Sequence, residues 1–175
     1  MCIRDRYTID YARIYDMQTC SFRQSCIYGP RQFGIEDQGW VAWFSIAALL
    51  RRPITLYGDG WQSRDVLDVG DLVLAYEAAW NHRATISGKA FNVGGGPENV
   101  LCLRALLSLL EDELSITIAP KLGQSRPGDQ PVFVCDIRSA KDNLNWAPHT
   151  SVSEGVKKLI TWVHKNRELF NSLHS

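Results

Sequence analysis

The order of apolar and polar positions divides the chain into segments that change type along its length. Two of them, residues 39–50 and 103–114, carry apolar residues at the spacing of one helix face. Others are short, rich in β-branched and aromatic residues, and stop at glycine or polar turns, which is typical of strands. The pattern predicts helices over residues 7–15, 39–50, 72–79, 103–114, 138–146 and 156–165. It predicts strands or extended segments over residues 19–25, 53–57, 64–69, 89–96, 115–120 and 131–136.

Particular residues give further detail for two of these helices. Asp71 is expected to cap the third helix, with Leu72, Tyr76 and Ala79 on its buried face. Ser151 and Glu154 have the spacing of a capping box before the last helix. Strands that alternate with helices predict an α/β fold with some parallel pairing. A single helix precedes the first strand, so the sheet is expected to be the last part of a larger one.

Composition narrows the possible partners. The 175 residues fit one domain, and 19 basic residues balance 19 acidic ones. A nucleic-acid partner is therefore not expected, because general phosphate binding needs an excess of basic residues. No apolar run reaches about 18 residues, so no membrane span is expected either.

The cysteines indicate a cytoplasmic protein. Their number is odd and no CxxC pair occurs, which favours reduced thiols over a disulfide framework or a zinc site. No metal site is predicted. Three of them are expected to act as small apolar residues, namely Cys20, Cys102 and Cys135; the other two are Cys2 and Cys26.

Two glycine clusters invite comparison with phosphate-binding loops. A dinucleotide fingerprint needs G-x-G-x-x-G, and both Gly94–Asn99 and Gly58–Ser63 lack the last glycine. Both are therefore predicted to be turns. Arg64 and Arg126 are better candidates for holding phosphate, because a guanidinium group donates two parallel hydrogen bonds to phosphate oxygens. The alternative is that each arginine pairs with a neighbouring carboxylate on the surface, as in many Arg-Asp sequences.

Four segments, taken in order, resemble a known family. They are "FRQSCIYGPRQ", "ITLYGDGWQSRDVLDVGDLVLAYEAA", "KAFNVGGG" and "RPGDQPVFVCDIRSAKDNLNW". Together they are similar to the C-terminal part of extended short-chain dehydrogenases, the NAD-dependent epimerase/dehydratase family. The resemblance runs from about Tyr7 to Leu169. Residues of about 7–35 would be the last part of a Rossmann-type dinucleotide-binding domain, and about 36–175 mainly the nucleotide-sugar region with returning strands.

The resemblance implies roles for residues on both sides of a reaction site. Gln24, Ser25, Cys26 and Tyr28 would border the NAD of the full-length protein. Substrate-binding roles are implied for Gln38, Gly39, Trp40, Arg64, Arg126 and Asp129. In these roles the two arginines would clamp a diphosphate and Asp129 would face the nucleotide ribose.

The segment "DQGW" is most similar to the family's 2-epimerases of CDP-dideoxyhexoses, which implies a CDP-sugar substrate and a transient 2-keto sugar. Alternatives are a nucleotide-sugar 4-epimerase, a 4,6-dehydratase, or a non-catalytic binding module. The family's Tyr-x-x-x-Lys pair is absent from the sequence, so no catalytic residue is assigned. The chain is therefore expected to be an inactive fragment, cut from a full-length protein that forms a homo-oligomer.

Overall fold

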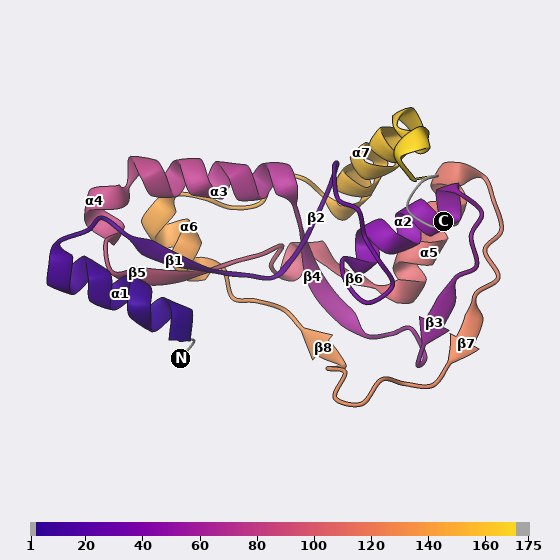
Figure 1. Cartoon of the computed structure of the whole chain (residues 1–175), viewed down its shortest axis with the longest axis horizontal. Helices are drawn as coiled ribbons and strands as arrows, with labels where there is room; N and C mark the ends of the chain where they lie inside the picture. Colours follow the sequence, from indigo (N-terminus) through magenta and orange to yellow (C-terminus); the bar gives the residue numbers. More distant parts are fainter. Residues whose placement is uncertain (1–2, 171–175) are drawn as a thin grey trace.

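The computed structural model describes residues 3–170 and confirms an α/β fold with parallel strand pairs (Figure 1). The helices are α1 (Ile3–Tyr15), α2 (Trp40–Leu49), α3 (Val69–Asn81), α4 (Arg83–Ile86), α5 (Leu103–Leu114), α6 (Arg138–Leu144) and α7 (Val152–Lys165), with 3-10 turns η1 (Pro97–Asn99) and η2 (Arg167–Phe170). The strands are β1 (Cys20–Gln24), β2 (Cys26–Tyr28), β3 (Thr55–Tyr57), β4 (Ser63–Asp68), β5 (Lys89–Val93), β6 (Val100–Cys102), β7 (Lys121–Gly123) and β8 (Val132–Phe133).

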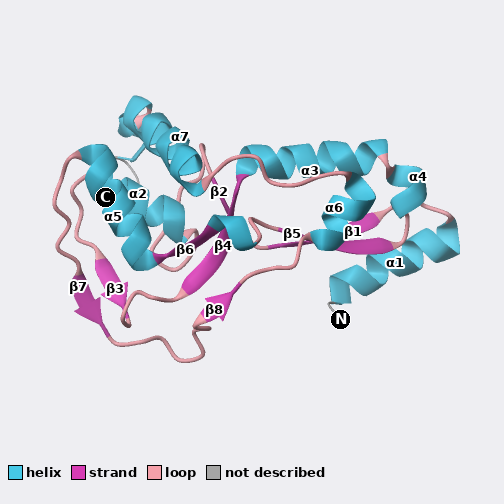
Figure 2. Ribbon diagram, turned by 180° about the vertical axis from the view of Figure 1, so that it is seen from behind, coloured by secondary structure: helices cyan, strands magenta, loops and turns pink. Residues whose placement is uncertain are grey.

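One end of the molecule is built on a parallel pair of strands. β1 and β5 run side by side, with Phe22 opposite Phe91. Their apolar side chains face the core beneath α3 and α6, where Phe91 is 1 % exposed. The other face of β1 meets α1, because Asp5 accepts hydrogen bonds from Ser21 and Arg23. Figures 1 and 2 show the resulting layers, with α1 and α3 on opposite sides of the strands.

The other end surrounds β4, which pairs with three strands. It runs parallel to β2 and β8 and antiparallel to β6. A separate parallel pair, β3 and β7, lies at the far edge (Figure 2). Helices α2, α5 and α7 enclose the larger apolar core, in which Leu106, Leu110 and Leu159 are fully buried. The stripe predicted for α5 thus lies in the core. Of the predicted capping box, the N-cap half is confirmed, because Ser151 Oγ accepts from the N–H of Glu154, while the Glu154 carboxylate pairs with Lys158.

Helix α2 differs from the prediction of a one-sided helix. Eight of its ten residues are buried, while Trp40 and Trp43, expected to face the core, are only half-buried. The reason is that α2 lies between α5 and α7, so apolar contacts surround it instead of covering one face.

The start of α3 also differs. Its N-cap is Asp68, whose side chain accepts from the N–H of Gly70, whereas Asp71 lies inside the first turn. Asp71 is buried and accepts from the backbone N–H groups of His149 and Thr150, so it ties the start of α3 to the approach of α7. Tyr76, predicted to share one helix face with Leu72 and Ala79, is 51 % exposed and stacks on Phe22, whereas the other two are buried.

The strand predicted over residues 115–120 is wrong in position. Ser115 adopts φ 50° and ends α5, and Glu111 then accepts from the N–H of Ile118. Strand pairing starts only at β7, where Lys121 lies opposite Thr55. The β-branched residues of this segment therefore pack their side chains without joining a sheet.

A close contact between β2 and α7 gives a stability prediction. A Cβ added at Gly155 would lie 2.8 Å from Tyr28 Cζ and closer still to its hydroxyl. Gly155→Ala is therefore expected to lower the free energy of unfolding by about 2 kcal/mol through overpacking. Urea denaturation measures this change. Tyr28→Phe, combined with Gly155→Ala, should recover part of the loss; a double variant no more stable than Gly155→Ala would contradict the contact.

Candidate functional site

All six residues to which the resemblance assigns a substrate role line one cavity. Its volume is about 370 Å³, within the range of small-molecule sites. Gln38, Gly39 and Trp40 line it at the start of α2, and Arg64, Arg126 and Asp129 line it from β4 and the loop before β8. These six residues come from three separated parts of the sequence, so the fold brings them together. Their binding roles stay predictions.

Arg64 is held at the cavity wall by two oxygen atoms. Its Nη2 donates to Asp129 Oδ1 at 2.7 Å and its Nη1 to the carbonyl of Ser63 at 2.9 Å. The side chain is only 19 % exposed, so its guanidinium group has a restricted orientation. Asp129 is 65 positions away in the sequence, which means that this ion pair closes the 126–129 loop onto β4.

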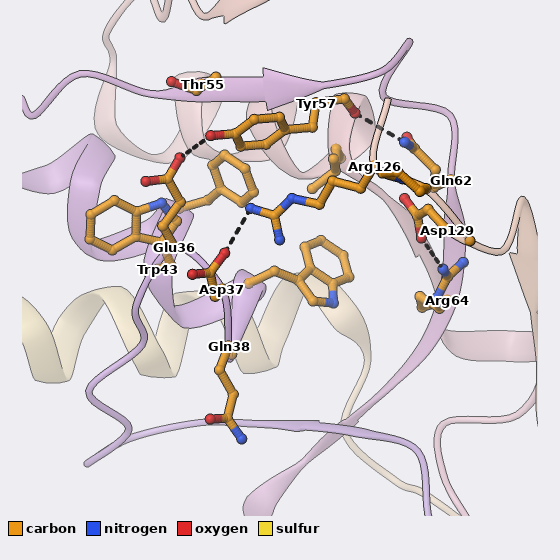
Figure 3. A pocket seen from close by; sticks show the side chains of 16 residues that line it. Glu36, Asp37, Gln38, Trp43, Thr55, Tyr57, Gln62, Arg64, Arg126 and Asp129 are labelled. Atoms are coloured by element: carbon orange, nitrogen blue, oxygen red, sulfur yellow. Dashed lines mark hydrogen bonds and ion pairs between the residues drawn. The ribbon is translucent and has the colours of Figure 1, made fainter. Parts of the chain in front are cut away.

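Arg126 makes a comparable arrangement across the cavity. Its Nη2 lies 3.0 Å from Asp37 Oδ1, and its guanidinium carbon lies 4.4 Å from the centre of the Tyr57 ring. Figure 3 shows this side chain reaching between Asp37 and Tyr57. Both arginines therefore have carboxylate partners, but these are distant in sequence and are not the neighbouring acids that one sequence interpretation expected. Both also line a common cavity, as the other interpretation expected.

A tight turn presents the polar segment before α2 to this cavity. Ile35 and Gln38 exchange backbone hydrogen bonds of 2.9 and 3.0 Å. Gly39 then takes φ 74°, a left-handed conformation that favours glycine, and α2 starts at the next residue. The turn places Glu36, Asp37 and Gln38 at the cavity, which explains a polar insertion directly before a buried helix.

The residues expected to border the cofactor lie at the end of β1 and along β2. Ligands of open α/β sheets bind outside the carboxyl ends of parallel strands, and Gln24 and Ser25 occupy that position. Gln24 donates to the hydroxyl of Tyr76. The next strand begins at Cys26, and burial raises the pKa of its thiol. Tyr28 is 2 % exposed and packs in the core, so its position gives its predicted cofactor contact no support. Burial also raises the pKa of its hydroxyl.

Ser25 does not line the cavity, because Asp65 holds its side chain. Ser25 Oγ donates to Asp65 Oδ1 at 2.6 Å. The same fully buried carboxylate accepts from the backbone N–H of Gly96 and from both the N–H and the thiol of Cys135. Burial and this carboxylate raise the pKa of Cys135 to about 12. Cys135 is therefore a hydrogen-bond donor and not only the small apolar residue that was expected.

Asp65 joins three segments directly behind Arg64. They are the end of β1, the glycine turn after β5, and the segment after β8. A Cβ at Gly94 would meet Asp65 and Cys135 and would lie 2.7 Å from Ser25 Cβ, so glycine leaves the space for this network. The glycine cluster thus forms a turn, as predicted. The backbone N–H of Gly96 in this turn donates to Asp65. Sequence reasoning missed Asp65, because it resembles an ordinary surface partner of its neighbour Arg64.

Sequence reasoning also missed the other side of the cavity. Tyr57 donates from its hydroxyl to Glu36 Oε1 at 2.9 Å, and Trp43 and Phe44 contribute aromatic surface. The mixture of acids and aromatic residues around "EDQGWVAWF" was the available indication.

Three further features concern metal ligands, thiols and membrane-spanning helices among the described residues. Within residues 3–170, no group of three or more His, Cys, Asp and Glu residues could hold a metal ion. The described cysteines, Cys20, Cys26, Cys102 and Cys135, are free thiols, and Cys2 lies outside the described residues. No described helix has the length and apolar character that crossing a membrane requires.

Comparison with known proteins gives relatives of one kind. The chain is 41% identical over 163 residues to CDP-paratose 2-epimerase of Salmonella typhi, covering 90% of this chain and 48% of that protein. A crystal structure of UDP-glucose 4-epimerase with UDP-glucose from Thermotoga maritima superposes with a TM-score of 0.82 at 29% identity, covering 93% of this chain and 51% of the other. The crystal structure of UDP-glucose 4-epimerase from Thermus thermophilus in complex with NAD superposes with a TM-score of 0.77 at 27% identity, covering 91% of this chain and 51% of the other.

The chain spans about half the length of the curated relatives it matches. The pattern of the NAD dependent epimerase/dehydratase family matches residues 3–94, which is more than half of the chain and includes both Arg64 and the end of β1. Three findings agree with this match: the parallel strands, the cavity lined by both Arg64 and Arg126, and the similarity to solved epimerases. The chain belongs to the NAD dependent epimerase/dehydratase family.

Proposed function

We propose that this chain is the nucleotide-sugar-binding part of an NAD-dependent epimerase that acts on a CDP-sugar. The observation that carries the proposal is that Arg64 from β4 and Arg126 from the distant loop before β8 line one cavity with Gln38, Trp40 and Asp129. The similarity to CDP-paratose 2-epimerase supports the choice of a CDP-sugar and of a 2-epimerisation.

The arginines can bind a diphosphate by exchanging partners. Each is now neutralised by one carboxylate, Arg64 by Asp129 and Arg126 by Asp37. Asp37 is 81% exposed, so water can solvate its carboxylate when Arg126 turns to a phosphate. A diphosphate offers each guanidinium a doubly charged group with several acceptor oxygens, which favours the exchange. Asp129, beside Arg64, would then accept from a ribose hydroxyl.

The cofactor of the family fits this chain along one wall only. NAD, when bound, supplies the acceptor and donor of hydride. Gln24 and Ser25 would border it at the carboxyl end of β1, and Asp65 keeps the Ser25 hydroxyl in a fixed orientation. The glycine fingerprint and the Tyr-x-x-x-Lys pair do not occur in this sequence. The groups that bind the pyrophosphate of NAD and that move the sugar proton would therefore come from outside these residues. The complete enzyme would act as a homo-oligomer.

A second candidate is a 4-epimerase or 4,6-dehydratase acting on a UDP- or dTDP-sugar. The likeness to the Thermotoga maritima enzyme, solved with UDP-glucose, favours it. Isothermal titration of the purified chain with CDP, UDP and dTDP tests both. Saturable binding with CDP tightest supports the proposal; tighter binding of UDP or dTDP would support the second candidate, and binding of none would overturn both.

The chain alone is expected to have no epimerase activity. Its sequence lacks the tyrosine and lysine that the family uses for proton transfer, and it has residues for one wall of the cofactor site. Incubation with NAD and CDP-paratose, followed by chromatography of the sugars, measures turnover. The Salmonella typhi enzyme serves as the positive control. Epimerisation above the rate without protein would contradict this expectation.

A further inference from the structure

The cavity has chemically different sides. Figure 3 shows the Arg64–Asp129 pair on one side, Glu36 with Trp43 and Tyr57 on the other, and Arg126 between them. A nucleoside diphosphate has the same polarity, with two phosphates at one end and a flat base at the other. If the arginines take the diphosphate, the base therefore lies toward Glu36, Trp43 and Tyr57.

This second side suits a nucleobase. Trp43, Phe44 and Tyr57 provide aromatic surface, and a base that stacks on such a ring gains affinity whatever its identity. Stacking alone therefore does not separate cytosine from uracil or thymine. That discrimination needs a polar group that meets the edge of the base.

Glu36 is such a group. The hydroxyl of Tyr57 donates to Glu36 Oε1 at 2.9 Å, which orients the carboxylate at the cavity wall. An ionised carboxylate only accepts hydrogen bonds, and it has two oxygen atoms, so it can accept from Tyr57 and from a ligand together. Asp37 is less suited, because its carboxylate pairs with the guanidinium group of Arg126.

We propose that Glu36 is a specificity-determining residue that accepts a hydrogen bond from the exocyclic amino group of cytosine. This inference rests on the proposed function, since it assumes a nucleoside diphosphate in the cavity. Uracil and thymine carry a carbonyl oxygen at that position, which would face the carboxylate acceptor to acceptor. Carboxylates discriminate cytosine in the same way where proteins recognise base edges in DNA.

The size of the effect follows from the loss of one charged hydrogen bond. Removing such a bond, or leaving the carboxylate facing another acceptor, changes affinity by about 10- to 100-fold. CDP is therefore expected to bind at least tenfold more tightly than UDP. In Glu36→Gln the ratio should fall to about two or less, because an amide can present either a donor or an acceptor.

The experiment titrates CDP, UDP and N4,N4-dimethyl-CDP into the chain and into two variants by calorimetry. Glu36→Gln is the test, and Glu77→Gln is its matched control, because Glu77 is an exposed glutamate on α3 that does not line the cavity. Dimethylation removes the donor from the ligand and leaves the protein unchanged. It should weaken binding about tenfold to the parent chain and Glu77→Gln, and have little effect on Glu36→Gln.

The outcomes separate the two proposals. The role of Glu36 is overturned, and the proposed function left intact, by either of two results. One is that Glu36→Gln retains the preference for CDP; the other is that dimethylation weakens binding equally to the parent chain and to Glu36→Gln. Equal binding of CDP and UDP by the parent chain overturns the role of Glu36 and the choice of a CDP-sugar. If none of the three nucleotides binds, the proposed function fails and the role of Glu36 fails with it.

Discussion

Replacing Arg64 with alanine is expected to weaken the binding of CDP to this chain by about 100-fold. The side chain is four-fifths buried and donates to Asp129 and to the carbonyl of Ser63. Its removal takes one of two guanidinium groups from the cavity and also leaves Asp129 without its cation. An unpaired carboxylate then faces an anionic ligand, so the loss combines a missing attraction with a new repulsion. Isothermal titration calorimetry measures the change.

Two variants define what this result means. Arg64→Lys keeps the charge but not the planar fork, and is expected to bind CDP with intermediate affinity. Arg83→Ala removes an exposed arginine whose partners are the ring and carbonyl of Trp80, away from the cavity, and should bind as the parent does. Unchanged affinity in Arg64→Ala, with a native circular dichroism spectrum, would mean that the cavity is not the diphosphate site.

Replacing Asp65 with alanine is expected to lower the free energy of unfolding by about 4 kcal/mol. The carboxylate is completely buried and accepts from Ser25, from Gly96, and from both donors of Cys135. Alanine would leave the donors of Gly96 and Cys135 without this acceptor in a tightly packed region, while the Ser25 hydroxyl would keep the backbone carbonyl of residue 65. The loss therefore exceeds that of one ordinary hydrogen bond.

Urea denaturation followed by tryptophan fluorescence measures this loss. Ser25→Ala is the control, because it removes one donor and leaves the carboxylate with its backbone partners; about 1 kcal/mol is expected. An Asp65→Ala variant within 1 kcal/mol of the parent would show that the network contributes little to stability.

The sequence was informative where structure depends on neighbouring positions. The stripe of α5 and the N-cap of α7 were predictable, since helix periodicity and capping involve residues three or four apart. The same reasoning failed for α2, because surrounding a helix with other helices is a property of the tertiary packing. It also misplaced the strand after α5, where β-branched residues pack without pairing.

The site divides in the same way. Arg64 and Arg126 could be nominated from their chemistry, and the resemblance related them to one ligand. Their carboxylate partners could not be assigned, because Arg64 and Asp129 are 65 positions apart and only the tertiary fold brings them together. Asp65 was overlooked for a similar reason, since its partners lie on three other segments.

The burial of α2 on all sides has a consequence for redesigning this protein. Random substitutions between Val41 and Leu49 would mostly yield chains that do not fold, since eight of these positions are buried. The turn of residues 35–39 and the loop of residues 124–130 are largely exposed, and both face the cavity. A mutant library aimed at new nucleotide preferences should therefore vary these two loops and keep the helix behind them constant.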